Sequence, residues 1–154
     1  MLKNPFMTDK DWENNWHPNF TRQENWGDPN KIYRELVIRL QTTRSMSGKP
    51  TRINCAFATT GHARNSKHYL GQAADIVIMG LPLSLQFFYA IRAGFRGIGV
   101  YPYWNTPGLH VDVRPLDDGH PIDMWFRDKN GLYESNMSTK TFTKIIRGDY
   151  DALK

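Results

Sequence analysis

The chain has 154 residues, of which 40% are hydrophobic and 13% aromatic, so it carries enough apolar side chains for one folded domain. This composition excludes a disordered or low-complexity chain, and no apolar stretch approaches the roughly 20 residues of a membrane span. The net charge of +5 favours an anionic partner such as a cell-wall polymer, a nucleic acid or a membrane surface. The single cysteine, Cys55, excludes an internal disulfide and a cysteine-rich zinc ribbon.

The N-terminal segment, residues 1–27, is polar and irregular but contains three tryptophans. We expect it to form an aromatic-rich arm on a single domain that covers residues 1–154. A helix is predicted next, because Asp28 can cap it, Pro29 suits its first position and Gly48 follows its end. Apolar residues recur within it at helical spacing, and they are Ile32, Leu36, Val37 and Leu40.

Strands and two further helices are predicted after Pro50. Ile53, Cys55 and Phe57 alternate with more polar residues, which indicates a half-buried strand with Cys55 pointing inward. The other predicted strands are 73–79, 98–103 and 109–114. The predicted helices are 83–93 and a last helix from Thr139, with Ser138 as its cap, Phe142, Ile145 and Ile146 inward and Gly148 at its end. This order predicts an α+β fold with a small, largely antiparallel sheet flanked by helices.

Four polar side chains stand out against this pattern. Asp75 lies inside an apolar strand, where a carboxylate needs a partner. His110 and Asp112 are two residues apart on a strand, so they share one of its faces. His68 precedes Asp75 by seven residues, in a turn. Two imidazoles and one carboxylate are a ligand set typical of catalytic zinc, whose remaining position holds a water with its pKa lowered to about 7.

The same residues have a purely structural alternative, in which His68 is a loop residue, Asp75 a strand-end cap and His110 a strand histidine with satisfied hydrogen bonds. The motifs around them favour the metal site. Residues 66–75 have the form S-x-H-x-x-G-x-A-x-D, and G-x-G-x-Y-P at 97–102 precedes H-V-D at 110–112. Together these motifs resemble the zinc D-alanyl-D-alanine carboxypeptidase family of murein peptidases, in the branch with an H-V-D last motif.

The resemblance covers about residues 19–127 and implies a hedgehog/DD-peptidase-like fold and a Zn²⁺ cofactor. His68, Asp75 and His110 match the zinc ligands of the family. Ser66 and Gly71 match the turn that orients the first histidine. Trp125, after the last motif, matches a family tryptophan, and it could line the pocket or be a packing residue.

Asp112 is the candidate general base that the resemblance implies. Many family members place a catalytic acid three residues before the last histidine, but Pro107 occupies that position here and cannot carry a proton. Asp112 shares the face of His110 and could take a proton from the metal-coordinated water and pass it to the leaving amine. Its alternative role is to orient His110 or a neighbouring arginine.

Substrate contacts are where this chain departs from the family. The usual Ser-Gly-Tyr-Arg stretch, whose arginine grips the substrate, corresponds to residues 55–58, which hold no arginine. Arg64 or Arg114 could replace it as an anion clamp, since a guanidinium binds a carboxylate with two hydrogen bonds. His62 could bind substrate or an oxyanion. For all three residues the alternative is an ordinary surface side chain.

The sequence therefore predicts a zinc metallopeptidase that hydrolyses an amide bond in the stem or cross-bridge peptides of peptidoglycan. Endopeptidase activity is favoured over carboxypeptidase activity, because the arginine that would hold a terminal carboxylate is missing. We expect no nucleic-acid partner and no membrane span. The N-terminus shows no secretory signal, so we expect synthesis in the cytoplasm and action at the wall after release, as in an endolysin-like or virion-associated enzyme. The alternative is a non-hydrolytic, metal-containing wall-binding or virion assembly module.

Overall fold

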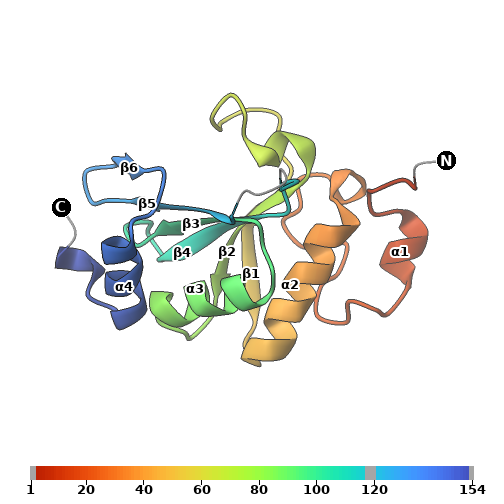
Figure 1. Cartoon of the computed structure of the whole chain (residues 1–154). Helices are drawn as coiled ribbons and strands as arrows, with labels where there is room; N and C mark the ends of the chain where they lie inside the picture. The colour runs from red at the N-terminus through yellow and green to blue at the C-terminus, as the bar shows by residue number, and fades with distance from the viewer. Residues whose placement is uncertain (1–2, 117–120, 153–154) are drawn as a thin grey trace.

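A six-stranded sheet forms the centre of the computed structural model, which describes residues 3–116 and 121–152 (Figure 1). The strands follow the spatial order β1-β2-β4-β3-β5-β6. Their bounds are Thr51–Cys55 (β1), Ala73–Ile78 (β2), Gly97–Tyr101 (β3), Gly108–Asp112 (β4), Asp123–Arg127 (β5) and Tyr133–Glu134 (β6). Only β3 and β5 pair in parallel among these strands, so the prediction of an α+β fold with a largely antiparallel sheet is confirmed.

Two of the helices pack on one side of this sheet. The α-helices are α1 (Asp9–Glu13), α2 (Arg34–Ser47), α3 (Leu83–Arg92) and α4 (Thr139–Arg147), and the 3-10 turns are η1 (Pro29–Lys31), η2 (Lys67–Leu70) and η3 (Tyr150–Ala152). α2 and α3 contact the strands and lie below the sheet in Figure 1, whereas η2 stands above it. Within residues 3–116 and 121–152, no helix is long and apolar enough to cross a membrane.

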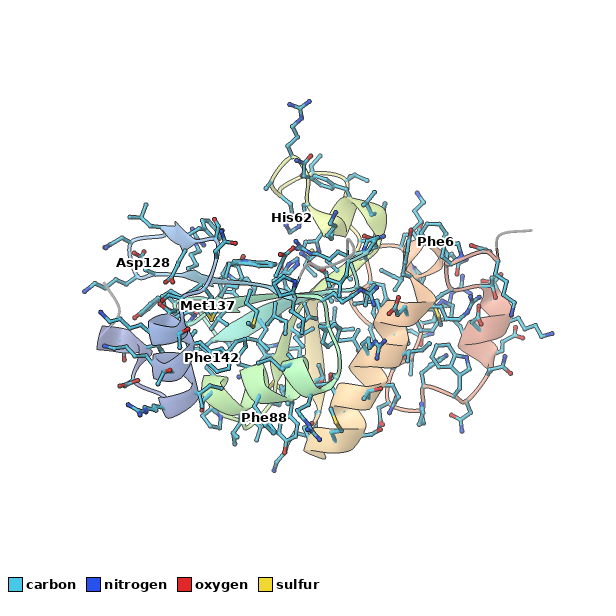
Figure 2. The ribbon with its side chains drawn as sticks, viewed as in Figure 1. Phe6, His62, Phe88, Asp128, Met137 and Phe142 are labelled. Atoms are coloured by element: carbon cyan, nitrogen blue, oxygen red, sulfur yellow. The ribbon has the colours of Figure 1, made fainter. Side chains whose placement is uncertain are left out.

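The sheet has one apolar and one polar face because side chains alternate along each strand. Cross-strand register places Ala74, Val111 and Ile98 side by side, and all three are fully buried beneath the helices. Phe87 of α3 is buried there too, while its neighbour Phe88 points away from the sheet (Figure 2). The opposite face carries the polar residues of β2 and β4, on the same side as His62 and the turn η2.

The N-terminal segment packs along α2 through both polar and apolar contacts. Arg34 Nη2 donates a hydrogen bond of 2.7 Å to Asp11 Oδ2. Phe20 and Trp26 are almost completely buried and belong to the same core as the apolar side of α2. The indole of Trp26 also donates to the backbone carbonyl of Thr21 at 2.8 Å, which satisfies its one polar atom inside this core.

The first long helix begins later than its sequence signals predict. Asp28 caps the short turn η1, and Ile32 and Tyr33 are extended before α2 starts. Neighbouring segments hold this break open, because Ile32 O accepts from Met7 N at 2.8 Å and Tyr33 N donates to Gly71 O at 2.9 Å. The predicted end at Gly48 is confirmed, and the predicted apolar stripe is fully buried. Long-range backbone pairing thus overrides the cap and proline signals.

Two predictions of inward-pointing side chains were wrong. A register shift between Ile53 and Cys55 interrupts the alternation of β1, so Ala56 is buried and Cys55 is only partly buried. Such an irregularity turns the strand and redirects the side chain after it. In α4, Ile145 is fully buried, but Ile146 is 41% exposed, because consecutive side chains on a helix point about 100° apart.

Candidate metal centre

Strand register builds the polar face around a single row of residues. Asp75 of β2 pairs with His110 of β4, His110 pairs with Gly99 of β3, and Gly99 pairs with Trp125 of β5. Residues paired in this way project from the same face of a sheet. A Cβ on Gly99 would lie 2.3 Å from Trp125 Nε1, so the missing side chain lets the indole lie over β3 beside His110. The two ring centroids are 5.1 Å apart.

The third candidate ligand, His68, comes from the turn η2 above this row. Ser66 caps the turn by accepting a hydrogen bond from His68 N at 3.2 Å. Gly71 ends it in the left-handed conformation, with φ of 70°. His68 is almost fully buried. Its Nδ1 lies 2.6 Å from Ala56 O, and because a carbonyl can only accept, Nδ1 carries the ring proton and donates a hydrogen bond to it. Nε2 then faces the strands.

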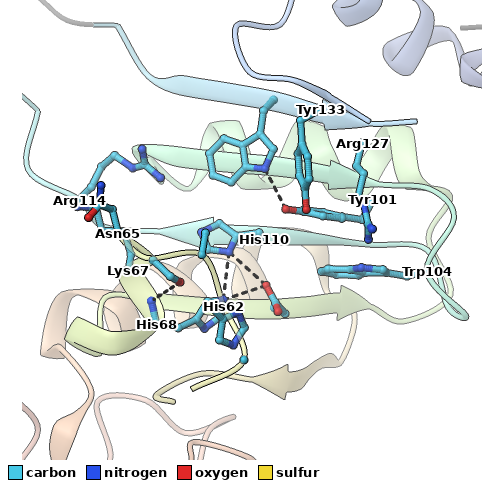
Figure 3. A pocket seen from close by; sticks show the side chains of 15 residues that line it. His62, Asn65, Lys67, His68, Tyr101, Trp104, His110, Arg114, Arg127 and Tyr133 are labelled. Carbon is cyan, nitrogen blue, oxygen red and sulfur yellow. Dashed lines mark hydrogen bonds and ion pairs between the residues drawn. The ribbon is translucent and has the colours of Figure 1, made fainter. Parts of the chain in front are cut away.

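Three donor atoms converge where this turn meets the sheet (Figure 3). His68 Nε2, Asp75 Oδ1 and His110 Nδ1 lie 3.2 Å from one another in all three pairs. Ligands about 2.0–2.1 Å from a tetrahedral zinc ion are separated from each other by about 3.3 Å. The spacing and the nitrogen and oxygen donors therefore fit a zinc ion with three protein ligands.

Hydrogen bonds behind the imidazoles determine which atoms face the centre. Ala56 O binds His68 Nδ1, and Asp112 Oδ2 lies 2.9 Å from His110 Nε2. With those nitrogens protonated, the two opposing nitrogens and Asp75 Oδ1 all present lone pairs to one another. Three acceptors can approach this closely only around positive charge, so the geometry requires a cation or additional protons. Such outer hydrogen bonds are typical of metal-binding histidines.

Electrostatics also favour positive charge at this point. Burial alone would lower the pKa of His68, but hydrogen bonds to Asp75, Cys55 and the Ala56 backbone, together with the charge of Asp75, outweigh burial and raise the pKa to about 10. Burial alone would raise the pKa of Asp75, but its hydrogen bonds to His110 and His68 lower it to about 2. A proton and a metal ion therefore compete for the same place, and metal binding there releases protons.

Gly71 offers a direct test of how the turn positions His68. A Cβ at this residue would lie 1.7 Å from the backbone oxygen of Lys31, in addition to the strain of a positive φ. We expect Gly71→Ala to lower the free energy of unfolding by about 3 kcal/mol or more, measured by chemical denaturation. Gly48→Ala is the matched control, because Gly48 has φ of 65° but no atom within 4 Å of the added Cβ, and it should cost about 1 kcal/mol. Equal losses in the two variants would contradict a steric role for Gly71.

Asp112 lies on the same face as His110, as its spacing predicts, but it is completely buried. Its Oδ2 accepts from His110 Nε2 and from Arg114 Nη2 at 2.6 Å, and its Oδ1 accepts from Arg114 Nε at 2.8 Å and from Arg114 N at 3.1 Å. These bonds hold its pKa well below the usual range, although burial acts in the opposite direction. A carboxylate that accepts four hydrogen bonds suits the alternative role better than that of a general base. In that role Asp112 orients His110 and Arg114.

A groove of about 670 Å³ lies over the three donors. Its lining includes Gly61, His62, Ala63, Asn65, Ser66, Lys67, His68, Asp75, Tyr101, Trp104, His110, Arg114, Trp125, Arg127 and Tyr133. Trp125 therefore lines the groove, and its Nε1 donates to Tyr101 Oη at 3.0 Å. The ring of Tyr101 stacks on Trp104 with centroids 4.2 Å apart, which gives the groove a flat aromatic wall.

The three candidate substrate residues differ in position. His62 lines the groove and stacks on His68 with centroids 4.1 Å apart, and burial lowers its pKa. Arg114 lines the groove, but its guanidinium binds Asp112 and, through Nη1, Asp123 Oδ2 at 2.8 Å. Arg64 is exposed and is not part of the lining. Neither arginine is thus placed as a free anion clamp.

Sequence reasoning missed Arg127 and Tyr133, which line the groove from β5 and β6. The range 123–127 was not predicted as a strand, so the alternation of Trp125 and Arg127 on one face went unused. That alternation was the available signal. Tyr133 had none, because the two-residue strand β6 is too short to show a pattern.

A family model described as peptidoglycan L,D-endopeptidase MepK matches residues 33–118. The match covers more than half of the chain and includes all three candidate ligands. No match was found among curated proteins.

Proposed function

The chain belongs to the family of peptidoglycan L,D-endopeptidase MepK and is a peptidoglycan peptidase; from that premise we propose that it is a zinc-dependent endopeptidase. It would hydrolyse an amide bond in the stem or cross-bridge peptides. The observation that carries this proposal is the convergence of His68, Asp75 and His110 at mutual distances of 3.2 Å, in the wall of a groove.

These three residues would hold the metal. When bound, zinc supplies polarisation of the scissile carbonyl and a lowered pKa for water. Asp112 keeps His110 in the tautomer whose Nδ1 faces the groove, and Ala56 O does the same for Nε2 of His68. Both histidines are therefore held ready to bind the cation without reorganisation.

The aromatic wall would orient the peptide over the donors. Burial raises the pKa of Tyr101 well above its usual value, so its phenol stays protonated at neutral pH. Because its oxygen already accepts from Trp125, its own O–H can donate a hydrogen bond to a peptide oxygen. Fixing the peptide in this way contributes to rate by lowering the entropy lost on reaching the transition state.

The proposal is tested by incubating the zinc-loaded protein with purified sacculi and identifying the released fragments by mass spectrometry. We expect cross-linked muropeptides to be cleaved within their peptides, with far slower removal of single C-terminal residues. Matched incubation with a chelator should stop the cleavage. Protein that sediments with sacculi but leaves every muropeptide intact would support the non-hydrolytic wall-binding module instead.

A further inference from the structure

The end of the groove beyond the aromatic wall carries a cation that the proposed chemistry does not use. Arg127 lies on β5, two residues after Trp125, and lines the groove together with Tyr133. Its guanidinium carbon is 5.5 Å from the centroid of the Tyr133 ring. Figure 3 shows Arg127, Tyr133 and Tyr101 grouped at the opposite end of the groove from His68. Arg127 also lies outside the segment 33–118 that the family model matches.

The polar contacts of Arg127 differ from those of Arg114. Arg114 uses Nε, Nη1 and Nη2 on the carboxylates of Asp112 and Asp123. Arg127 donates from Nε to Gly131 O at 3.4 Å, and no carboxylate in residues 3–116 and 121–152 lies within ion-pair distance of it. Its two terminal nitrogens are therefore able to bind an external carboxylate with paired hydrogen bonds.

Sheet geometry sets the distance between this cation and the donors. β5 is two strands from β4, and Arg127 is two residues along from the row that contains His110. With strands about 4.8 Å apart and residues about 3.3 Å apart, the Cα atoms of Arg127 and His110 are separated by about 12 Å. An extended peptide covers that distance in about three or four residues.

We propose that Arg127 is a specificity-determining residue that binds a free carboxylate of the substrate, about three or four residues from the scissile bond. This inference rests on the proposed function, and it defines the substrate class as an anionic peptide. The Tyr133 ring beneath the guanidinium reduces its contact with water, which strengthens a paired hydrogen bond to carboxylate.

A matched pair of cross-linked muropeptides tests this, one with free carboxyls near the cleaved bond and one with the same carboxyls amidated. We expect the zinc-loaded protein to cleave the free form with about 10- to 100-fold higher kcat/KM. Arg127→Gln should remove that preference, mainly through a higher KM, and Arg127→Lys should restore part of it. Arg147→Gln on the exposed end of α4 removes the same charge away from the groove and should keep the full preference.

Binding of the same two muropeptides to the metal-free protein, measured by calorimetry, separates this inference from the proposed function. If both are cleaved equally well and Arg127→Gln changes nothing, the Arg127 inference is overturned while the peptidase stands. If neither is cleaved, the proposed function fails. In that case tighter binding of the free form, lost only in Arg127→Gln, still supports the carboxylate site, and equal binding of both forms overturns it.

Discussion

Replacing His68 by alanine is expected to abolish stoichiometric zinc binding and to lower kcat/KM for muropeptide hydrolysis by about 10³-fold or more. The variant removes one of the three proposed protein ligands, and the two that remain would hold zinc weakly. Zinc per chain, measured by elemental analysis after dialysis, and cleavage of purified muropeptides are the two readouts. Both should fall together, because in the proposed function the ion held by His68 supplies the chemistry.

His62→Ala is the matched control for metal content. Its imidazole stacks on His68, but its nitrogens are not among the three converging donors, so it should keep one zinc per chain. Because His68 is buried, circular dichroism has to show that His68→Ala stays folded. A folded His68→Ala protein that still carried one zinc ion per chain would disprove the ligand assignment.

Asp112→Asn is expected to weaken zinc binding by about 10- to 100-fold and to regain most of its activity at saturating zinc. An amide NH₂ in place of an oxygen would face either His110 Nε2 or the Arg114 guanidinium, so the imidazole loses its fixed tautomer or the arginine loses an acceptor. The measurement is a zinc titration followed by activity and by competition with a chromogenic chelator.

Asp123→Asn provides the control, because Asp123 is the other carboxylate bound by Arg114 and does not contact His110. It should leave the zinc affinity unchanged. Asp112 would instead act as the general base if Asp112→Asn bound zinc as tightly as the unaltered protein but lost turnover at every zinc concentration. The titration therefore distinguishes between the two roles that the sequence left open.

Local patterns predicted most of the fold and the faces on which the candidate ligands lie, whereas the choice of these residues as ligands came from the family resemblance. The strict alternation at 109–114 predicted that His110 and Asp112 share a face, and strand register confirms it. The apolar run at 73–79 predicted a buried strand with one misplaced carboxylate, Asp75. In the structure that carboxylate lies 3.2 Å from a nitrogen of His68 and a nitrogen of His110. These inferences succeeded because each depends only on residues close together in the chain.

Part of what the sequence did not predict depends on contacts between distant segments. α2 starts at Arg34 because residues 7 and 71 pair with the backbone before it, and no local signal encodes that. Cys55 was misplaced because a register shift in β1 is visible only against β2. The contacts of Asp112 required the position of Arg114, which could have pointed to solvent. Arg127 was missed along with its strand.

The three strand pairings that align Asp75, His110, Gly99 and Trp125 also determine which side chains enter the hydrophobic layer, so the candidate metal centre and that layer depend on the same register. If β4 slipped by a single residue, His110 would turn toward the helices and Leu109 would turn toward the groove. Such a misfolded molecule would lose a candidate metal ligand and expose apolar side chains at the same time. Such misfolded molecules would therefore aggregate. They would not stay soluble and compete with the folded protein for peptidoglycan.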